Sequence, residues 1–90
     1  MNNKKQEVAA LCTRAVHRID DAINKHKKGE PADLSIPLLQ TIREQVEQMG
    51  QHLDPVHFQS SYGRFILDWP DDHGLVGELV ELEYQYGRLQ

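Results

Sequence analysis

The sequence predicts an all-α protein, a compact antiparallel bundle of four helices over residues 4–28, 36–52, 55–68 and 72–88. Apolar residues recur at three- and four-residue spacing along most of the chain, which is the period of a helix. Proline and glycine occur where one helix would end and the next would begin. No stretch alternates apolar and polar residues as a half-buried strand would, and 90 residues make a single domain, residues 1–90.

The first helix, over residues 4–28, carries one apolar face. That face contains Val8, Leu11, Cys12, Ala15, Ile19, Ala22, Ile23 and His26. Lys25, Lys27 and Lys28 stand near the C-terminus of the helix, where positive charge is favourable. Gly29 follows them and can adopt the left-handed conformation that ends a helix.

The second helix, over residues 36–52, begins at a recognisable cap. Ser35 can accept a hydrogen bond from the first turn, and Pro37 is tolerated there. A single apolar stripe follows: Leu39, Ile42, Val46, Met49 and Leu53. Gly50 interrupts the helix at a cost of about 1 kcal/mol relative to alanine, so it marks either an early end or a close helix crossing.

The remaining two helices are delimited by Asp-Pro and Trp-Pro pairs. Asp54 followed by Pro55 is a typical helix start and predicts a helix over 55–68. Pro70 disfavours a helical conformation at the preceding residue. Asp71 or Asp72 is then expected to cap the fourth helix, over 72–88.

These last two helices carry apolar residues on two faces. In the third, an aromatic stripe contains Phe58, Tyr62, Phe65 and Trp69, and the opposite region contains Val56, Gly63 and Leu67. In the fourth, one stripe contains Leu75, Leu79, Leu82, Tyr86 and Leu89, and a second contains Val76, Val80, Tyr84 and Gly87. A helix with two apolar faces requires two surfaces to pack against.

Two interpretations of this pattern remain open. Helices three and four could be central and covered from both sides by helices one and two. Alternatively, one face forms the core and the other binds a partner, because a monomer rarely leaves a large apolar patch exposed. We expect the aromatic stripe of the third helix and the leucine stripe of the fourth to be buried against helices one and two. The predicted partner-binding residues are Val56, Gly63, Leu67, Val76, Val80, Tyr84 and Gly87. A homodimer is the simplest form of such a partner.

Charge is distributed unevenly along the chain. Residues 1–30 hold seven Lys/Arg and four Asp/Glu, a balance of +3, whereas residues 31–90 hold three and ten, a balance of −7. Arg14, Arg18, Lys25 and Lys28 share one side of the first helix. They are expected to be solvated or to pair with the acidic fourth helix at Glu78, Glu81 or Glu83. The alternative function is a nucleic-acid-associated regulator, although binding to nucleic acid is not favoured for so acidic a chain.

Neither a metal site nor a catalytic site is predicted. The five histidines form no HExxH motif, and the single cysteine, Cys12, excludes a thiolate-rich zinc site. A weak site at His73 with Asp71 and Asp72 keeps a metal or ligand sensor open as a further alternative. Ser60 and Ser61 lack an accompanying base or glycine-rich loop. We therefore expect no cofactor and no enzymatic activity.

The function expected from the sequence is non-catalytic binding of another protein through the acidic, aromatic-rich C-terminal half. Small acidic helical proteins suit an inhibitor, immunity or antitoxin-like role, or that of a regulatory adaptor. No secretory signal precedes the first helix, and no apolar run approaches the roughly 18–20 residues needed to span a membrane. The expected location is the cytoplasm.

Overall fold

A computed structural model describes residues 3–89, and within them it contains four α-helices and no β-strand. The helices are α1 (Lys4–Lys27), α2 (Ile36–His52), α3 (Gly63–Ile66) and α4 (Leu75–Gly87). The prediction of an all-α fold is thus confirmed. The Cα radius of gyration is 12.9 Å, close to the value of about 12 Å expected for a compact chain of this length.

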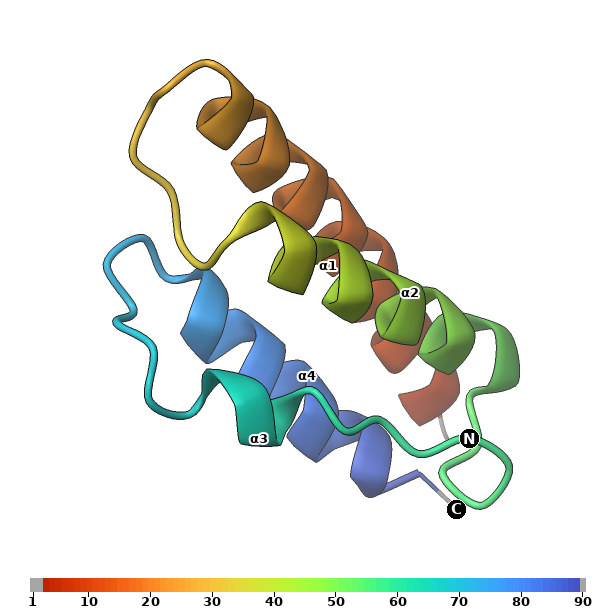
Figure 1. The fold of residues 1–90 in the computed structure, drawn as a ribbon. Coiled ribbons are helices and arrows are strands. Elements are labelled where there is room, and N and C mark those ends of the chain that lie inside the picture. The colour runs from red at the N-terminus through yellow and green to blue at the C-terminus, as the bar shows by residue number, and fades with distance from the viewer. Residues whose placement is uncertain (1–2, 90) are drawn as a thin grey trace.

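The two long helices α1 and α2 form a hairpin, and α4 packs against α1 (Figure 1). Figure 1 shows α1 and α2 side by side and running in opposite directions, with α3 lying against α4. The crossing of α1 and α2 is close at Gly50, where an added Cβ would lie 3.4 Å from the Cβ of Cys12. Gly50 therefore marks a helix crossing and not a helix end.

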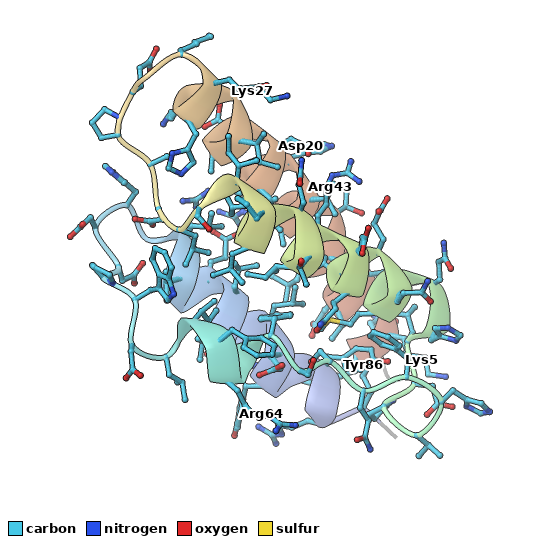
Figure 2. The ribbon with its side chains drawn as sticks, in the orientation of Figure 1. Lys5, Asp20, Lys27, Arg43, Arg64 and Tyr86 are labelled. Carbon is cyan, nitrogen blue, oxygen red and sulfur yellow. The ribbon has the colours of Figure 1, made fainter. Side chains whose placement is uncertain are left out.

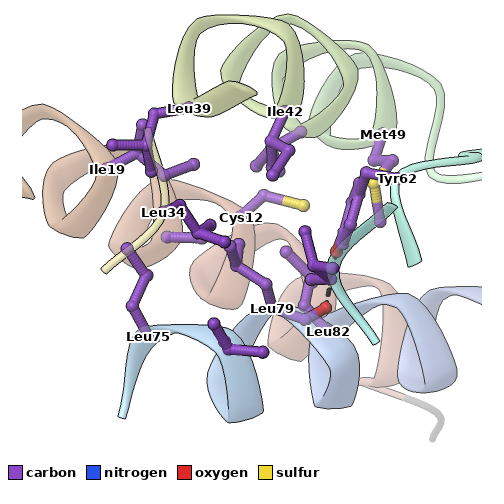
Figure 3. Close-up of a cluster of buried hydrophobic side chains, with 14 of the residues drawn as sticks. Cys12, Ile19, Leu34, Leu39, Ile42, Met49, Tyr62, Leu75, Leu79 and Leu82 are labelled. Atoms are coloured by element: carbon purple, nitrogen blue, oxygen red, sulfur yellow. Dashed lines mark hydrogen bonds between the residues drawn. The ribbon is translucent and has the colours of Figure 1, made fainter. Parts of the chain in front are cut away.

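The hydrophobic core lies between α1, α2 and α4, and Figure 3 shows its side chains meeting there. Each of the stripes predicted for helices one and two supplies buried residues, among them Val8, Ile19, Ile42 and Val46. The stripe of α4 that runs from Leu75 to Tyr86 completes the core, so this face of the helix is also buried. Within residues 3–89, no helix is both long and apolar enough to cross a membrane.

The boundaries of α1 and α2 follow the signals in the sequence. Gly29 has φ 79°, so α1 ends where a left-handed residue was expected. Ser35 caps α2, since its Oγ accepts a hydrogen bond from the Leu38 amide at 3.4 Å. Leu53 ends α2 in the left-handed conformation, with φ 48°.

An ion pair joins the two helices of the hairpin at their outer edge. Arg43 Nε donates to Asp20 Oδ1 at 2.7 Å, and Figure 2 shows these residues on α2 and α1. The hydrogen bond from Arg43 lowers the pKa of the Asp20 carboxyl below its ordinary value. Both side chains remain partly exposed, and such pairs contribute only about 0–1 kcal/mol.

The prediction of a helix over 55–68 is wrong for most of its length. Asp54 nucleates a single turn, in which its Oδ1 accepts from the Val56 amide at 2.9 Å. Residues 58–61 have no helical structure, and α3 covers only Gly63–Ile66. Pro70 ends the helical turn that follows α3, as expected.

After the turn at residues 54–58, in which the Asp54 carbonyl accepts from the Phe58 amide at 3.1 Å, hydrogen bonds from other elements replace the helical ones. The side-chain oxygen of Gln45, on α2, accepts from the amides of Ser61 and Tyr62 at 2.8 and 3.1 Å. The hydroxyl of Tyr86, on α4, donates to the carbonyl oxygens of Asp54 and Phe58 at 2.8 and 2.7 Å. These contacts pair the amides of Ser61 and Tyr62 and the carbonyl of Phe58 without a helix, and they hold the segment between α2 and α4.

The predicted start and cap of the fourth helix are also wrong. The helix begins at Leu75, after Gly74 with φ 84°, and neither Asp71 nor Asp72 caps it. The cap is Asp33, from the loop between α1 and α2. Its carboxylate accepts from the His73 amide at 3.2 Å and from the Leu75 amide at 3.1 Å.

Shortening a buried side chain of α2 is expected to destabilise the protein. Ile42 and Val46 are both 0% exposed. Ile42→Ala or Val46→Ala should lower the free energy of unfolding by roughly 1–4 kcal/mol, because each leaves a cavity and loses apolar burial. Urea denaturation followed by circular dichroism measures the change. A difference within experimental error would contradict the placement of this stripe in the core.

Candidate functional site

The seven predicted partner-binding residues do not share one surface. Gly63 and Val76 are buried inside the monomer, and Val80 is partly buried against the core. Four others are exposed: Val56, Leu67, Tyr84 and Gly87. Whether any of them contacts a partner stays a prediction, and the interior positions of Gly63 and Val76 remove them from the surface considered below.

Large exposed apolar side chains concentrate around α3. Phe65 is 55% exposed, Leu67 is 70% exposed and Trp69 is 39% exposed. Two others lie elsewhere in the chain, Val56 at 84% and Tyr84 at 58%. Three large apolar groups within five residues therefore face solvent.

The short helix α3 turns these side chains outward because its other side is anchored. Ile66 is 0% exposed and belongs to the core, while Tyr62, immediately before α3, is also fully buried. The Trp69 amide donates to the Ile66 carbonyl at 3.1 Å, so a further turn follows the helix. With Ile66 inward, its neighbours Phe65 and Leu67 point away from the core.

Glu83 of α4 fixes the start of α3. Its carboxylate accepts from the Ser60 hydroxyl at 2.6 Å and from the Gly63 amide at 3.3 Å. A Cβ at Gly63 would collide with this carboxylate. Glycine at position 63 thus allows α3 to approach α4 closely. This internal contact accounts for the glycine that the sequence analysis assigned to a partner surface.

Acidic side chains accompany the exposed apolar groups. Asp68, Asp71 and Asp72 are all exposed, and no Lys or Arg occurs between Phe65 and Asp72. Arg64 precedes them on α3 (Figure 2). We refer to residues 65–72, with their three exposed apolar and three acidic side chains, as the 65–72 segment.

Sequence reasoning assigned part of this segment to the core. Phe65 and Trp69 were expected in one buried aromatic stripe with Phe58 and Tyr62, but only Tyr62 is fully buried. The stripe assumed an unbroken helical period, and the non-helical residues 58–61 reset it. Pro70, with Asp68 before it and Asp71 and Asp72 after it, was the available signal in the sequence that the chain leaves the core here.

The basic side of α1 is largely engaged within the chain. Arg18 donates to Glu78 Oε2 at 2.5 Å and to the His73 carbonyl at 3.1 Å, and Arg14 Nε lies 3.7 Å from Glu78 Oε1. Lys25 lies 3.5 Å from Asp21. The expected pairing of this stripe with α4 is confirmed at Glu78.

The residues considered for metal binding or nucleophilic chemistry do not converge. Among residues 3–89, no group of three or more His, Cys, Asp or Glu side chains is placed to hold a metal ion. His26 lies at the core boundary, with Nε2 3.3 Å from the Asp33 carbonyl oxygen. Burial raises the pKa of the Cys12 thiol to about 11, so at neutral pH it is a protonated thiol and a poor nucleophile.

Comparison with protein-family models, curated proteins and solved structures gives no match to this chain.

Proposed function

We propose that this chain is a small non-catalytic protein-binding module, built as a helical bundle, that binds another protein through its acidic C-terminal half. An inhibitor, immunity or antitoxin-like role, or that of a regulatory adaptor, belongs to this class. The three helices α1, α2 and α4 form the scaffold in this proposal. The contact surface is centred on the 65–72 segment.

One observation carries the proposal: Phe65, Leu67 and Trp69 are exposed next to Ile66, which is fully buried in the core, and Glu83 holds the residues just before them. Full burial of one such side chain contributes roughly 1.5–3 kcal/mol, so a partner that covers all three gains substantially. Aromatic groups on an anchored backbone also lose little conformational freedom on binding. Tryptophan and tyrosine are enriched among the residues that dominate interface energies.

The ion pairs of α1 argue against the alternative of a nucleic-acid-associated regulator. Glu78 lies against both Arg14 and Arg18, and Asp21 lies beside Lys25. A phosphate backbone would have to compete with these carboxylates for the same cations. The basic stripe is better explained as the surface that attaches α1 to α4.

Introducing a charge into the exposed apolar group tests the proposal. Tagged wild-type chain, incubated with extract of the native host, should retain a protein partner in stoichiometric amount. Leu67→Glu should reduce that retention by about tenfold or more, because a carboxylate would be desolvated in the interface. Quantitative mass spectrometry of the retained proteins gives the measurement.

Gln40→Glu provides a matched control, since it adds the same charge at an exposed position of α2. It should retain the partner as wild type does. Circular dichroism should show the same helical content in all three proteins, because Leu67 is 70% exposed. Absence of any stoichiometric partner for the wild-type chain would refute the proposed function.

A further inference from the structure

The side chains of the 65–72 segment indicate the chemistry of a partner that would bind there. Its exposed apolar residues need an apolar counterpart, and its exposed carboxylates, Asp68, Asp71 and Asp72, need cations. The surrounding half of the chain reinforces this demand, since residues 31–90 carry a balance of −7. Potentials of opposite sign steer two partners together and set their register.

We infer that the occupant of this segment is a basic amphipathic segment of another protein. Its apolar side chains would pack on Phe65, Leu67 and Trp69, and its Lys or Arg side chains would lie opposite the three aspartates. This inference rests on the proposed function and adds to it the chemistry of the partner. The apolar centre supplies binding energy, and the charged rim supplies selection and a fast encounter.

A second copy of this chain is a poor occupant. Within residues 3–89, at least five Lys and Arg side chains already contact acidic or aromatic groups of their own chain: Arg14, Arg18, Lys25, Arg43 and Arg88. Two molecules would also bring two regions of negative charge together. The same charge disfavours anionic lipid surfaces and nucleic acid. A cationic protein segment is the occupant that charge complementarity selects.

Trp69 is the only tryptophan of the chain and lies within the segment, so its fluorescence reports occupancy directly. The probe is a synthetic peptide without tryptophan, about five helical turns long, with Leu on one face and Lys on the other. Titration into the full chain should shift the Trp69 emission to shorter wavelength and saturate. A peptide with Glu in place of each Lys should leave the emission unchanged.

Removing the local negative charge should weaken the complex. The variant Asp68→Asn/Asp71→Asn/Asp72→Asn is expected to raise the dissociation constant by about tenfold. This is the combined effect of losing three exposed ion pairs with the Lys side chains of the peptide, each of modest strength. The matched control Glu7→Gln/Glu44→Gln/Glu47→Gln removes equal charge from exposed positions of α1 and α2. It should change the dissociation constant less than about twofold, because distant exposed charges are screened.

Three results would overturn the inference. These are an unchanged Trp69 emission with the Lys peptide, equal weakening by the two triple variants, and a dimer in sedimentation that Asp68→Asn/Asp71→Asn/Asp72→Asn alters. Thermal unfolding of each variant verifies that it is folded. A fourth result would refute the basic occupant while leaving the proposed function intact: a host protein that wild type and this triple variant retain equally well.

Discussion

Tyr62→Ala is expected to lower the free energy of unfolding by about 3–5 kcal/mol, the cost typical of deleting a large buried aromatic side chain. Tyr62 is 0% exposed and lies between α2 and α4 (Figure 3). Its hydroxyl donates to the Leu79 carbonyl at 2.6 Å. Burial, with a smaller effect from the charge of Glu83, raises the pKa of this phenol, so it stays protonated as a donor over the physiological range.

Two further tyrosine variants separate packing from hydrogen bonding. Tyr62→Phe keeps the ring and should cost about 0.5–1.5 kcal/mol, because one buried hydrogen bond to the Leu79 carbonyl is lost. Tyr84→Ala changes a tyrosine of α4 that is 58% exposed, and it should alter stability by no more than about 0.5 kcal/mol. Chemical denaturation of the three variants measures these differences. An equally small effect of Tyr62→Ala would mean that residues 58–66 are not docked on the core.

Asp33→Ala has the second-largest expected effect, a loss of about 2–4 kcal/mol, because the buried Leu75 amide and the His73 amide lose a charged acceptor. Asp33 is 5% exposed, and among residues 3–89 it is the one charged residue that is buried. Its carboxylate binds the amides of His73 and Leu75, which lie some forty positions further along the chain. The loop between α1 and α2 thereby fixes the beginning of α4.

The position of the damage is as informative as its size. Without Asp33, amide hydrogen exchange should accelerate at the first turn of α4 and in the residues just before it, more than in α1 or α2. Asp33→Asn retains an acceptor oxygen and should lose less stability than Asp33→Ala. Asp72→Ala is the control for removing an exposed aspartate nearby, with an expected change within about 0.5 kcal/mol. If Asp72→Ala were the more damaging change, the helix cap would be the one that the sequence suggested.

The helices that the sequence predicts well are those whose signals are local. The end of α1 follows from Gly29, and the start of α2 follows from Ser35 and Pro37. The periodic apolar positions of both helices are the ones that the core uses. Propensity, cap and pattern agree in these segments, so no distant residue has to be known.

The third helix was not predictable because its backbone partners lie far away in the sequence. Asp54 and Pro55 indicate a helix start, and they do form a turn. The continuation is prevented by Gln45 and Tyr86, whose side chains take over the hydrogen bonding of the following residues. The cap of α4 is similar, since Asp33 replaces the adjacent aspartates. Tertiary contacts override local preference in both cases.

Prediction of the candidate site was partial for the same reason. Leu67 and Tyr84 were assigned to a second, outward face, and both are exposed. Phe65 and Trp69 were assigned to the core through a helical period that the chain interrupts. The concentration of acidic charge in residues 31–90 is a property of composition and therefore did not depend on the fold.

The most direct measurement of the central claim is a chemical-shift map of the labelled chain during titration with the Leu/Lys peptide. The amides of residues 65–72, together with the indole of Trp69, are expected to shift most and to saturate together. The basic side of α1 should be unaffected. Shifts concentrated at Arg14 and Arg18, or spread evenly over the molecule, would contradict a binding surface at the 65–72 segment.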